Sequence, residues 1–449
     1  MTFLNKPALK SSFKLAWPIS LQNTLVTMLS MIDVMMVSHL GNASVAAVGL
    51  GNRIQFVILI LVTGLSWGVG ILAAQYYGAG NQQKIRRSIL MGIVLGIVAL
   101  SPIIIASVIY ADGIMAIGSK DADVIAIGER YLWITMPSLL FVTVSMVFEN
   151  ALRSTNEVKL PMLLSVVAIV LNIVLNYWLI NGGLGVAALG VDGAAIATTV
   201  SRLFHMLLLI AVLIHIRHFL RPSSADIKSL NQFQPWKKLV LLVLPLMFSF
   251  GVWSLGTFVY QVIYGRMGTA ELAVISLLAP VEGMFISVFF GFASACAIMV
   301  GQRLGANQFD QAWSIARSFI TLAPVVALIL GIVMLILEPI IFLPFNDMPE
   351  STLALASNIF VLIALGAWIK ISNMTLAMGV LRAGGETKAC LYIDTIGMWL
   401  ISIPLTMLVA FYWQLPMFYV ALAAYSEEVC KLLLFGWRTI QKKWLRNLT

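Results

Sequence analysis

Charge is scarce in this sequence. Only 10% of its 449 residues are Asp, Glu, Lys or Arg, whereas 60% are hydrophobic, and the mean hydropathy is +0.97. So few charged side chains cannot cover the surface of a water-soluble protein of this length. The composition therefore excludes a soluble globular protein and predicts a chain that crosses a membrane several times.

Cysteine and histidine are also scarce. The cysteines, Cys296, Cys390 and Cys430, lie far apart in or beside apolar stretches, and their spacing offers neither a disulfide framework nor a zinc site. The four histidines form no HExxH motif or triad context, and no Walker motif for ATP occurs. We therefore expect neither an enzyme nor a protein that ATP drives directly, and we expect no cofactor and no metal.

Long apolar runs dominate the chain. Because about 20 apolar residues span the hydrocarbon layer, they predict an all-α integral membrane protein with twelve transmembrane helices. The predicted spans lie near residues 15–38, 45–75, 88–110, 125–149, 160–182, 190–216, 238–264, 272–301, 315–340, 352–380, 389–411 and 416–438. The first span follows Lys6, Lys10 and Lys14 and is followed at once by a second, so we expect it to be retained rather than cleaved.

The basic residues are distributed unevenly between the loops. With both termini on one side, most of the 28 lysines and arginines fall in the loops of that side. The positive-inside rule then predicts cytoplasmic termini in a plasma membrane, the inner membrane of a bacterium. These charges lie in short loops rather than in an aromatic-interleaved patch, so we expect the lipid bilayer as a partner and no nucleic acid.

The two halves of the chain resemble each other. At an offset of 227 residues Pro18 aligns with Pro245, and at 229 residues LRSTNEVK (152–159) aligns with LRAGGETK (381–388). The halves are predicted to be homologous six-helix bundles, 1–220 and 235–449, joined by a cytoplasmic linker at 221–234. Since each bundle has an even number of spans, the repeats are parallel and flank a central cleft, as in alternating-access transporters.

One carboxylate lies deep in the first apolar run. Asp33 shares a helical face with Asn23, Thr27 and Ser30, and an unpaired carboxylate at that depth costs several kcal/mol. Burial favours the neutral form of such a group, so Asp33 can take up a proton near neutral pH. A purely structural, hydrogen-bonded aspartate is the alternative.

A second polar face is expected on the fifth span, where Ser165, Asn172 and Asn176 recur at helical spacing. We expect this face to lie opposite Asp33, although asparagines also join membrane helices without any other role. The corresponding positions of the second half are Tyr260, Ile401 and Leu405. The sequence therefore predicts a polar site in the first half only.

Glu282 and Asp394 are acids inside predicted spans of the second half. Each is a secondary functional candidate, with charge pairing inside the second bundle as the alternative. Arg153 and Arg382 of the repeated LR-x-x-x-E-x-K motif are expected to form cytoplasmic ion pairs that tie the fourth predicted span to the fifth and the tenth to the eleventh.

Several motifs resemble the multidrug and toxic compound extrusion (MATE) family over essentially the whole chain. They are Trp17-Pro18, "AAQYYGAGNQQK" with its partner "VGQRLGANQFDQ", the paired LR-x-x-x-E-x-K loops, and "LNIVLNYWLINGGLGVAALGVDGAAIAT" at 171–198. The resemblance implies a cation-coupled antiporter that exports small organic, often cationic and amphipathic compounds. A lipid-linked oligosaccharide flippase of a related twelve-helix fold is the rival, and we expect a monomer.

Within that family, the chain resembles the DinF-like branch. This resemblance implies a cation-coupling site at Asp33, Asn172 and Asn176, with Pro18 as a hinge of the first helix; a harmless proline in the first helical turn is the alternative. Archaeal members carry aspartate at the position of Asn176. With one carboxylate fewer, H+ is favoured over Na+ as the coupling ion, because sodium prefers more oxygen ligands and charge. The NorM-like branch uses acids in helices 7 and 10, where this chain has Tyr260 and Lys370.

Overall fold

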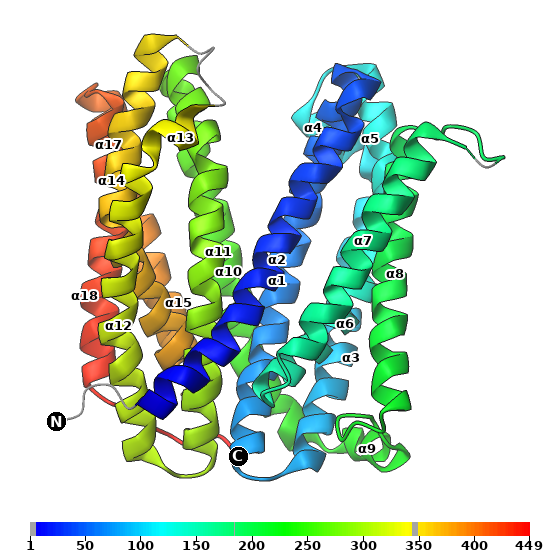
Figure 1. Cartoon of the computed structure of the whole chain (residues 1–449), viewed down its shortest axis with the longest axis vertical. Helices are drawn as coiled ribbons and strands as arrows, with labels where there is room; N and C mark the ends of the chain where they lie inside the picture. Colours follow the sequence, from blue (N-terminus) through cyan, green and yellow to red (C-terminus); the bar gives the residue numbers. More distant parts are fainter. Residues whose placement is uncertain (1–5, 184, 344–348) are drawn as a thin grey trace. The chain divides into compact units, whose positions relative to one another are not determined.

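The computed structural model describes residues 6–183, 185–343 and 349–449. In those ranges its elements are helices, with one isolated β-bridge between Gly183 and Val186 (Figure 1). The prediction of an all-α protein is confirmed.

Ten helices are long and apolar enough to cross a membrane, among the residues described. They are α1 (Lys6–Val37), α2 (Asn42–Gly78), α3 (Gln82–Ile109), α7 (Lys159–Asn181), α8 (Val191–His215), α10 (Phe233–Met267), α11 (Thr269–Gly305), α12 (Phe309–Ile336), α14 (Glu350–Met374) with its continuation η4 (Thr375–Leu381), and the run α15 (Thr387–Thr395), η5 (Ile396–Ser402), α16 (Ile403–Met407) and η6 (Leu408–Tyr412).

The two remaining predicted spans are interrupted helices. An eleventh crossing is the pair α5 (Ala122–Thr135) and α6 (Ser138–Ser154), which bends by 46° at a break that contains Pro137. The twelfth is α17 (Met417–Ala424) followed by α18 (Ser426–Ile440), and its charged residues Glu427, Glu428 and Lys431 make it less apolar than the others. Each predicted span therefore coincides with a helix or a helix pair.

Short elements connect these helices. They are η1 (Ser38–Leu40), α4 (Ala111–Gly118), α9 (Ser224–Lys228), η2 (Ser229–Asn231) and α13 (Glu338–Phe342). In the linker, Ser223 and Asp226 form a reciprocal capping box at the start of α9, and Arg86 of α3 lies 2.8 Å from the Asp226 carboxylate. The linker is thereby held against α3.

The chain divides into two compact units. One, called here the N-terminal unit, is Leu21–Met247; the other, the C-terminal unit, comprises the described part of residues 1–20 together with Phe248–Thr449. The division falls inside α1 and inside α10, shortly after Pro18 and Pro245 respectively. The repeat boundaries at 1–220, 221–234 and 235–449 stay a prediction.

Pro18 lies inside α1, which begins at Lys6. The alternative of a proline in the first helical turn is therefore wrong. A proline in a helix interior removes one backbone hydrogen bond and clashes with the preceding turn, so α1 is weakened at this point.

In the N-terminal unit, α2 packs against α3, α5 and α6, and α7 packs against α8. Close approach of α3 depends on small residues: a Cβ at Gly92 would lie 2.4 Å from Val69, and one at Gly96 would lie 2.5 Å from Leu65. These contacts hold the helices around the polar residues described below.

In the C-terminal unit, α11 packs against α12, α14 and η4, while α18 packs against α14 and η5. Three segments of this unit, η4, η5 and η6, are π-helical. A π-turn closes its hydrogen bond over one residue more than an α-turn, so it shifts the faces of the helix that follows, and such turns are frequent at functional sites.

Candidate functional site

Asp33 on α1 contacts the predicted partner face on α7. The Asn176 side-chain amide donates from Nδ2 to Asp33 Oδ1 over 2.7 Å and to Asn172 Oδ1 over 2.9 Å. Asn172 and Asn176 are buried, whereas Asp33 is half-buried. The structure thus brings together the three residues for which the sequence predicted a common site.

The side-chain oxygen of Asn176 is a further feature of this arrangement. Asn176 Oδ1 is buried and has no hydrogen-bond partner among the residues that the structure describes. A buried acceptor without a donor costs about 1–3 kcal/mol. The site therefore offers a place for a proton donor or a cation directly beside the Asp33 carboxyl group.

A cation on α8 belongs to the same polar region. Arg202 attracts Asp33 electrostatically, and its Nη1 donates to Gln55 Oε1 over 2.9 Å and to Ser138 Oγ over 2.8 Å. Arg202 was not among the predicted site residues. Its position in an apolar span was the available signal.

Helix α1 does not turn one continuous polar face toward Asn176. Thr27 and Ser30 hydrogen bond to the α1 backbone, at the carbonyl oxygens of Asn23 and Val26 respectively. The buried Asn23 Nδ2 has no partner within the described part of the chain. The expectation that these residues extend the Asp33 site finds no support in the contacts, because short hydroxyl side chains in helices readily bond to their own preceding turn.

Ser165, predicted to accompany Asn172 and Asn176, belongs to a second buried cluster of the N-terminal unit. Gln22 donates from Nε2 to Ser165 Oγ over 2.6 Å and to Glu149 Oε2 over 3.2 Å. Arg153 donates to Gln22 Oε1 over 2.7 Å and lies 3.5 Å from Glu149. Arg153 therefore ties α6 to α1, from a buried position rather than from an exposed loop.

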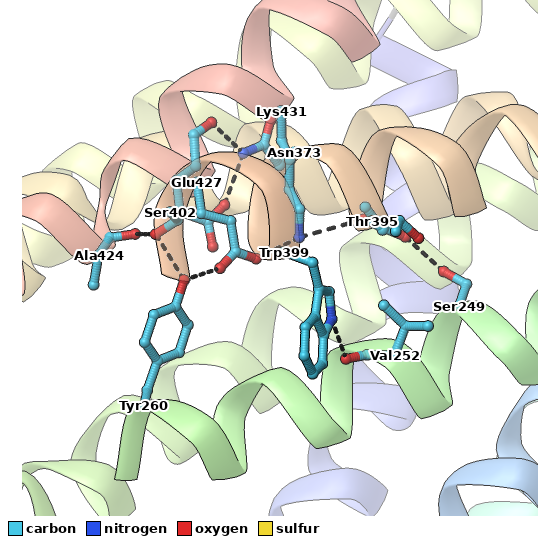
Figure 2. Close-up of polar contacts among 12 residues, drawn as sticks. Ser249, Val252, Tyr260, Asn373, Thr395, Trp399, Ser402, Ala424, Glu427 and Lys431 are labelled. Atoms are coloured by element: carbon cyan, nitrogen blue, oxygen red, sulfur yellow. Dashed lines mark hydrogen bonds and ion pairs between the residues drawn. The ribbon is translucent and has the colours of Figure 1, made fainter. Parts of the chain in front are cut away.

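The C-terminal unit contains a polar cluster where none was expected. Tyr260, the repeat counterpart of Asp33, has its hydroxyl group 2.7 Å from Ser402 Oγ and 2.9 Å from Glu427 Oε2 (Figure 2). The prediction of a polar site in the first half only is wrong.

The π-helical segment η5 explains why the sequence-based prediction failed at this position. At the repeat offset, Asn172 corresponds to the apolar Ile401, but η5 widens the helix over Ile396–Ser402. The neighbouring Ser402, rather than Ile401, therefore meets Tyr260. Glu427 was also missed, although an acid in the last apolar run was a visible signal.

Asp394 is paired within the C-terminal unit. It accepts a hydrogen bond from Ser249 over 2.5 Å, and it forms ion pairs with Arg382 at 3.2 Å and with Lys431 at 3.3 Å. Arg382 thereby joins the end of α15 to the end of the preceding span, as predicted for a tethering residue.

Glu282 on α11 pairs with Lys370 on α14 at 2.5 Å. Both secondary acids thus have charge partners inside the C-terminal unit, which was the alternative to a direct functional role. Among the described residues, no group of three or more His, Cys, Asp or Glu side chains is placed to hold a metal ion.

The fold and these clusters define a polytopic helical membrane protein with ionisable groups buried in each of two units. The MatE family model matches residues 18–178 and again residues 245–408, once in each half. The chain therefore belongs to the MatE family, the MATE family that the sequence motifs indicated.

Curated relatives match along most of the chain. It is 26% identical over 412 residues to the probable multidrug resistance protein NorM of Bradyrhizobium diazoefficiens, covering 85% of this chain and 82% of that protein. It is 26% identical to the probable multidrug resistance protein YoeA of Bacillus subtilis, covering 92% and 89% respectively. Mouse multidrug and toxin extrusion protein 2 is 25% identical, covering 87% of this chain and 67% of the mouse protein.

Solved structures share the fold. A crystal structure of MATE in complex with MaL6 superposes with a TM-score of 0.88 at 20% identity, covering 99% of this chain and 98% of that chain. An outward-facing multidrug resistance MATE transporter of the MOP superfamily superposes with a TM-score of 0.88 at 19% identity, covering 98% and 96%. These likenesses confirm the twelve-helix membrane fold.

Proposed function

We propose that this protein is a multidrug efflux antiporter, in which the inward movement of a cation drives the export of organic, often cationic compounds. The names of the curated relatives support multidrug export. The coupling proposal depends on one observation: the half-buried Asp33 carboxylate lies 2.7 Å from Asn176, whose own oxygen has no donor among the residues described.

The hydrogen bonds favour a proton as the coupling ion. When Asp33 is ionised, Asn176 Nδ2 donates to it, as the structure shows. When Asp33 is protonated, its O–H can donate to Asn176 Oδ1, which has no donor among the described residues. One neutral amide can therefore satisfy both states. Sodium would find only one carboxylate and few free oxygens here.

The proposed cycle couples the charge of Asp33 to the packing of α1. A proton that arrives from outside neutralises Asp33 and removes the cost of its charge in apolar surroundings. Helix α1, weakened at Pro18, then repacks and cargo is released outward. Loss of the proton to the cytoplasm restores the carboxylate. Each charge that moves through the membrane is worth about 2.3 kcal/mol per 100 mV.

The remaining parts of the proposal follow from the sequence. They are a DinF-like member of the family, acting as a monomer in a bacterial inner membrane, with both termini in the cytoplasm. The flippase rival needs free cations for a pyrophosphate group, and the sequence offers three candidates within or near the spans. Arg202 is bonded to Gln55 and Ser138. Lys370 is paired with Glu282, whereas Arg53 is exposed.

The test is export of a fluorescent cationic dye from proteoliposomes under a pH gradient, and separately under a sodium gradient. We expect the pH gradient alone to drive transport. Ser30→Ala is the matched control for Asp33→Asn, because Ser30 lies on the same helix and bonds only to its backbone in the contacts described. Transport driven by sodium alone would reject the proton, and no dye movement under either gradient would reject the proposed function.

A further inference from the structure

One polar cluster of the C-terminal unit contains more acids than bases; the buried Glu386 lies outside it and pairs with Arg438 and Arg446. The cluster contains four carboxyl groups and three cations. The carboxyl groups are those of Glu282, Asp394, Glu427 and Glu428, and the cations are Lys370, Arg382 and Lys431. The groups form one connected cluster, because Lys431 pairs with both Glu427 and Asp394, and Glu428 attracts both Lys370 and Lys431.

An unbalanced negative charge in a buried cluster is costly. If all seven groups were ionised, four negative charges would face three positive ones, which leaves one carboxylate without a cation. A bound proton is the simplest way to remove the excess. The described residues offer no group of three or more His, Cys, Asp or Glu side chains for a metal ion.

Glu428 forms no ion pair among the described residues, but it is only half-buried. Glu427, in contrast, is buried and shares its cation, Lys431, with Asp394. The surroundings of Glu427 therefore make it the carboxyl group that gains most from a proton. It faces Lys431 and Glu428 on α18 and Tyr260 on α10. Lys431 Nζ lies 2.5 Å from Glu427 Oε1, so this oxygen is occupied by a cation. The other oxygen, Oε2, faces the Tyr260 hydroxyl group at 2.9 Å, and a hydroxyl can act as donor or as acceptor.

A chain of hydroxyl groups extends from Glu427 Oε2 (Figure 2). Tyr260 lies 2.7 Å from Ser402 Oγ, and Ser402 donates to the Ala424 carbonyl oxygen over 2.9 Å. If Glu427 is ionised, Ser402 can donate to Tyr260, and Tyr260 to the carboxylate. If Glu427 is protonated, it can donate to Tyr260, Tyr260 to Ser402, and Ser402 to the Ala424 carbonyl. Both states are satisfied by rotation of hydroxyl hydrogens alone.

We propose that Glu427 is a second proton-binding site, separate from Asp33, with Tyr260 and Ser402 as the residues that position its proton. The step is a simple transfer: a proton from water binds to Glu427 Oε2, and the proton later returns to water. Protonation weakens the ion pair with Lys431, which keeps Asp394 as its partner. The charge of α18 is thereby coupled to its contacts with α10 and α15.

The test follows the carboxyl C=O stretching band by infrared difference spectroscopy on the purified full-length protein in lipid nanodiscs, between about pH 8 and about pH 6, where exposed carboxyl groups stay ionised. In Asp33→Asn, we expect one protonated-carboxyl band to remain. Adding Glu427→Gln should remove that band, while Glu271→Gln, a control at a half-buried position in the first turn of α11, should leave it unchanged.

Tyr260→Phe provides a second variant that keeps the carboxyl group and removes its hydroxyl partner. In the Asp33→Asn background, we expect the Glu427 band to move in frequency and in its pH midpoint. This variant decides the question if Glu427→Gln does not fold. A merely structural Glu427 would show no band to move.

Besides the absence of a band, two results would overturn the assignment. One is a band that survives both Glu427→Gln and Tyr260→Phe unchanged; the other is a difference signal that appears only when sodium is added. Because the spectra are recorded in Asp33→Asn and require no transport, failure of this inference is distinguishable from failure of proton coupling at Asp33.

Discussion

The N-terminal and C-terminal units place polar groups at corresponding positions but use different chemistry. At the repeat offsets, Arg153 corresponds to Arg382, and Arg202 corresponds to Lys431. Each of these cations lies in a buried or half-buried polar cluster. The repeat therefore preserves where positive charge is held inside each bundle.

The acidic residues, in contrast, lie on different helices in the two units. In the N-terminal unit the acids are Asp33 on α1 and Glu149 on α6; in the C-terminal unit the counterpart of Asp33 is Tyr260, and Glu427 on α18 lies against it. Similarly, Asp394 corresponds to Ser165, and it binds the arginine directly. The duplicated fold therefore places the negative charge on different helices in the two units, although each cluster still contains acidic and basic side chains.

The largest effect is expected from a substitution at Asp33, which tests whether the two units differ in function. Asp33→Asn mimics the protonated state permanently, so it should fold and reach the membrane but lose coupled dye export by more than about tenfold. Tyr260→Phe, at the corresponding position of the C-terminal unit, should keep measurable export. Dye efflux from proteoliposomes under a pH gradient measures both. Wild-type efflux by Asp33→Asn with an unchanged pH dependence would reject the mechanism.

The paired arginines test whether the shared frame is structural. Arg153→Ala and Arg382→Ala each remove one partner of a buried ion pair, which costs about 3–5 kcal/mol, so the amount of folded protein should fall more than transport per folded molecule. Fluorescence-detected size-exclusion chromatography measures folded protein. Arg303→Ala is the control, since Arg303 forms an exposed bond to Gln308. Normal protein levels with abolished efflux would contradict a tethering role.

The amides beside Asp33 should have smaller effects. Asn176→Ala removes the direct bond to Asp33, whereas Asn172→Ala removes only the support of Asn176, so the first should weaken efflux more. Each hydrogen bond between membrane helices is worth about 0.6–2 kcal/mol. Both variants should shift the pH dependence of efflux, measured as initial rate against pH. An unchanged pH profile in Asn176→Ala would show that the amide does not hold the coupling group.

The smallest effect is expected in the linker, outside the membrane. Burial raises the pKa of Asp226, but the hydrogen bonds from Arg86 and Ser223 outweigh it and hold this pKa below its ordinary value. The stabilisation is therefore full above about pH 4 and is lost as the pH falls through the lowered pKa. Asp226→Asn should cost about 1 kcal/mol at pH 7, and this cost should fade as the pH falls through the lowered pKa.

Thermal unfolding of the purified protein across this pH range measures the linker effect. Ser229→Ala is a matched control, because its hydroxyl group bonds to the Asp226 backbone carbonyl and not to the carboxylate. A cost for Asp226→Asn that stays constant down to pH 3 would show that the ionised carboxylate does not stabilise the linker.

The helices themselves were predictable from the sequence, because the length of an apolar run is a local property that membrane thickness limits directly. Helical periodicity was sufficient to predict, as a hypothesis, that α1 and α7 face each other at Asp33 and Asn176. Periodicity failed at Ser402, where a π-turn shifts the face, and it assigned Thr27 and Ser30 to a site although their hydroxyl groups bond to their own helix.

By itself, the sequence determined the membrane class, the number of spans, the duplication and the MATE resemblance, since each depends on composition or on residues at a fixed spacing. Only the tertiary structure decided which buried charges meet. Glu427 and Tyr260 are 167 residues apart in the chain, and their hydrogen bond exists because α18 and α10 bring them within 2.9 Å. Ion pairs in apolar surroundings depend on such distances, which no one-dimensional pattern contains.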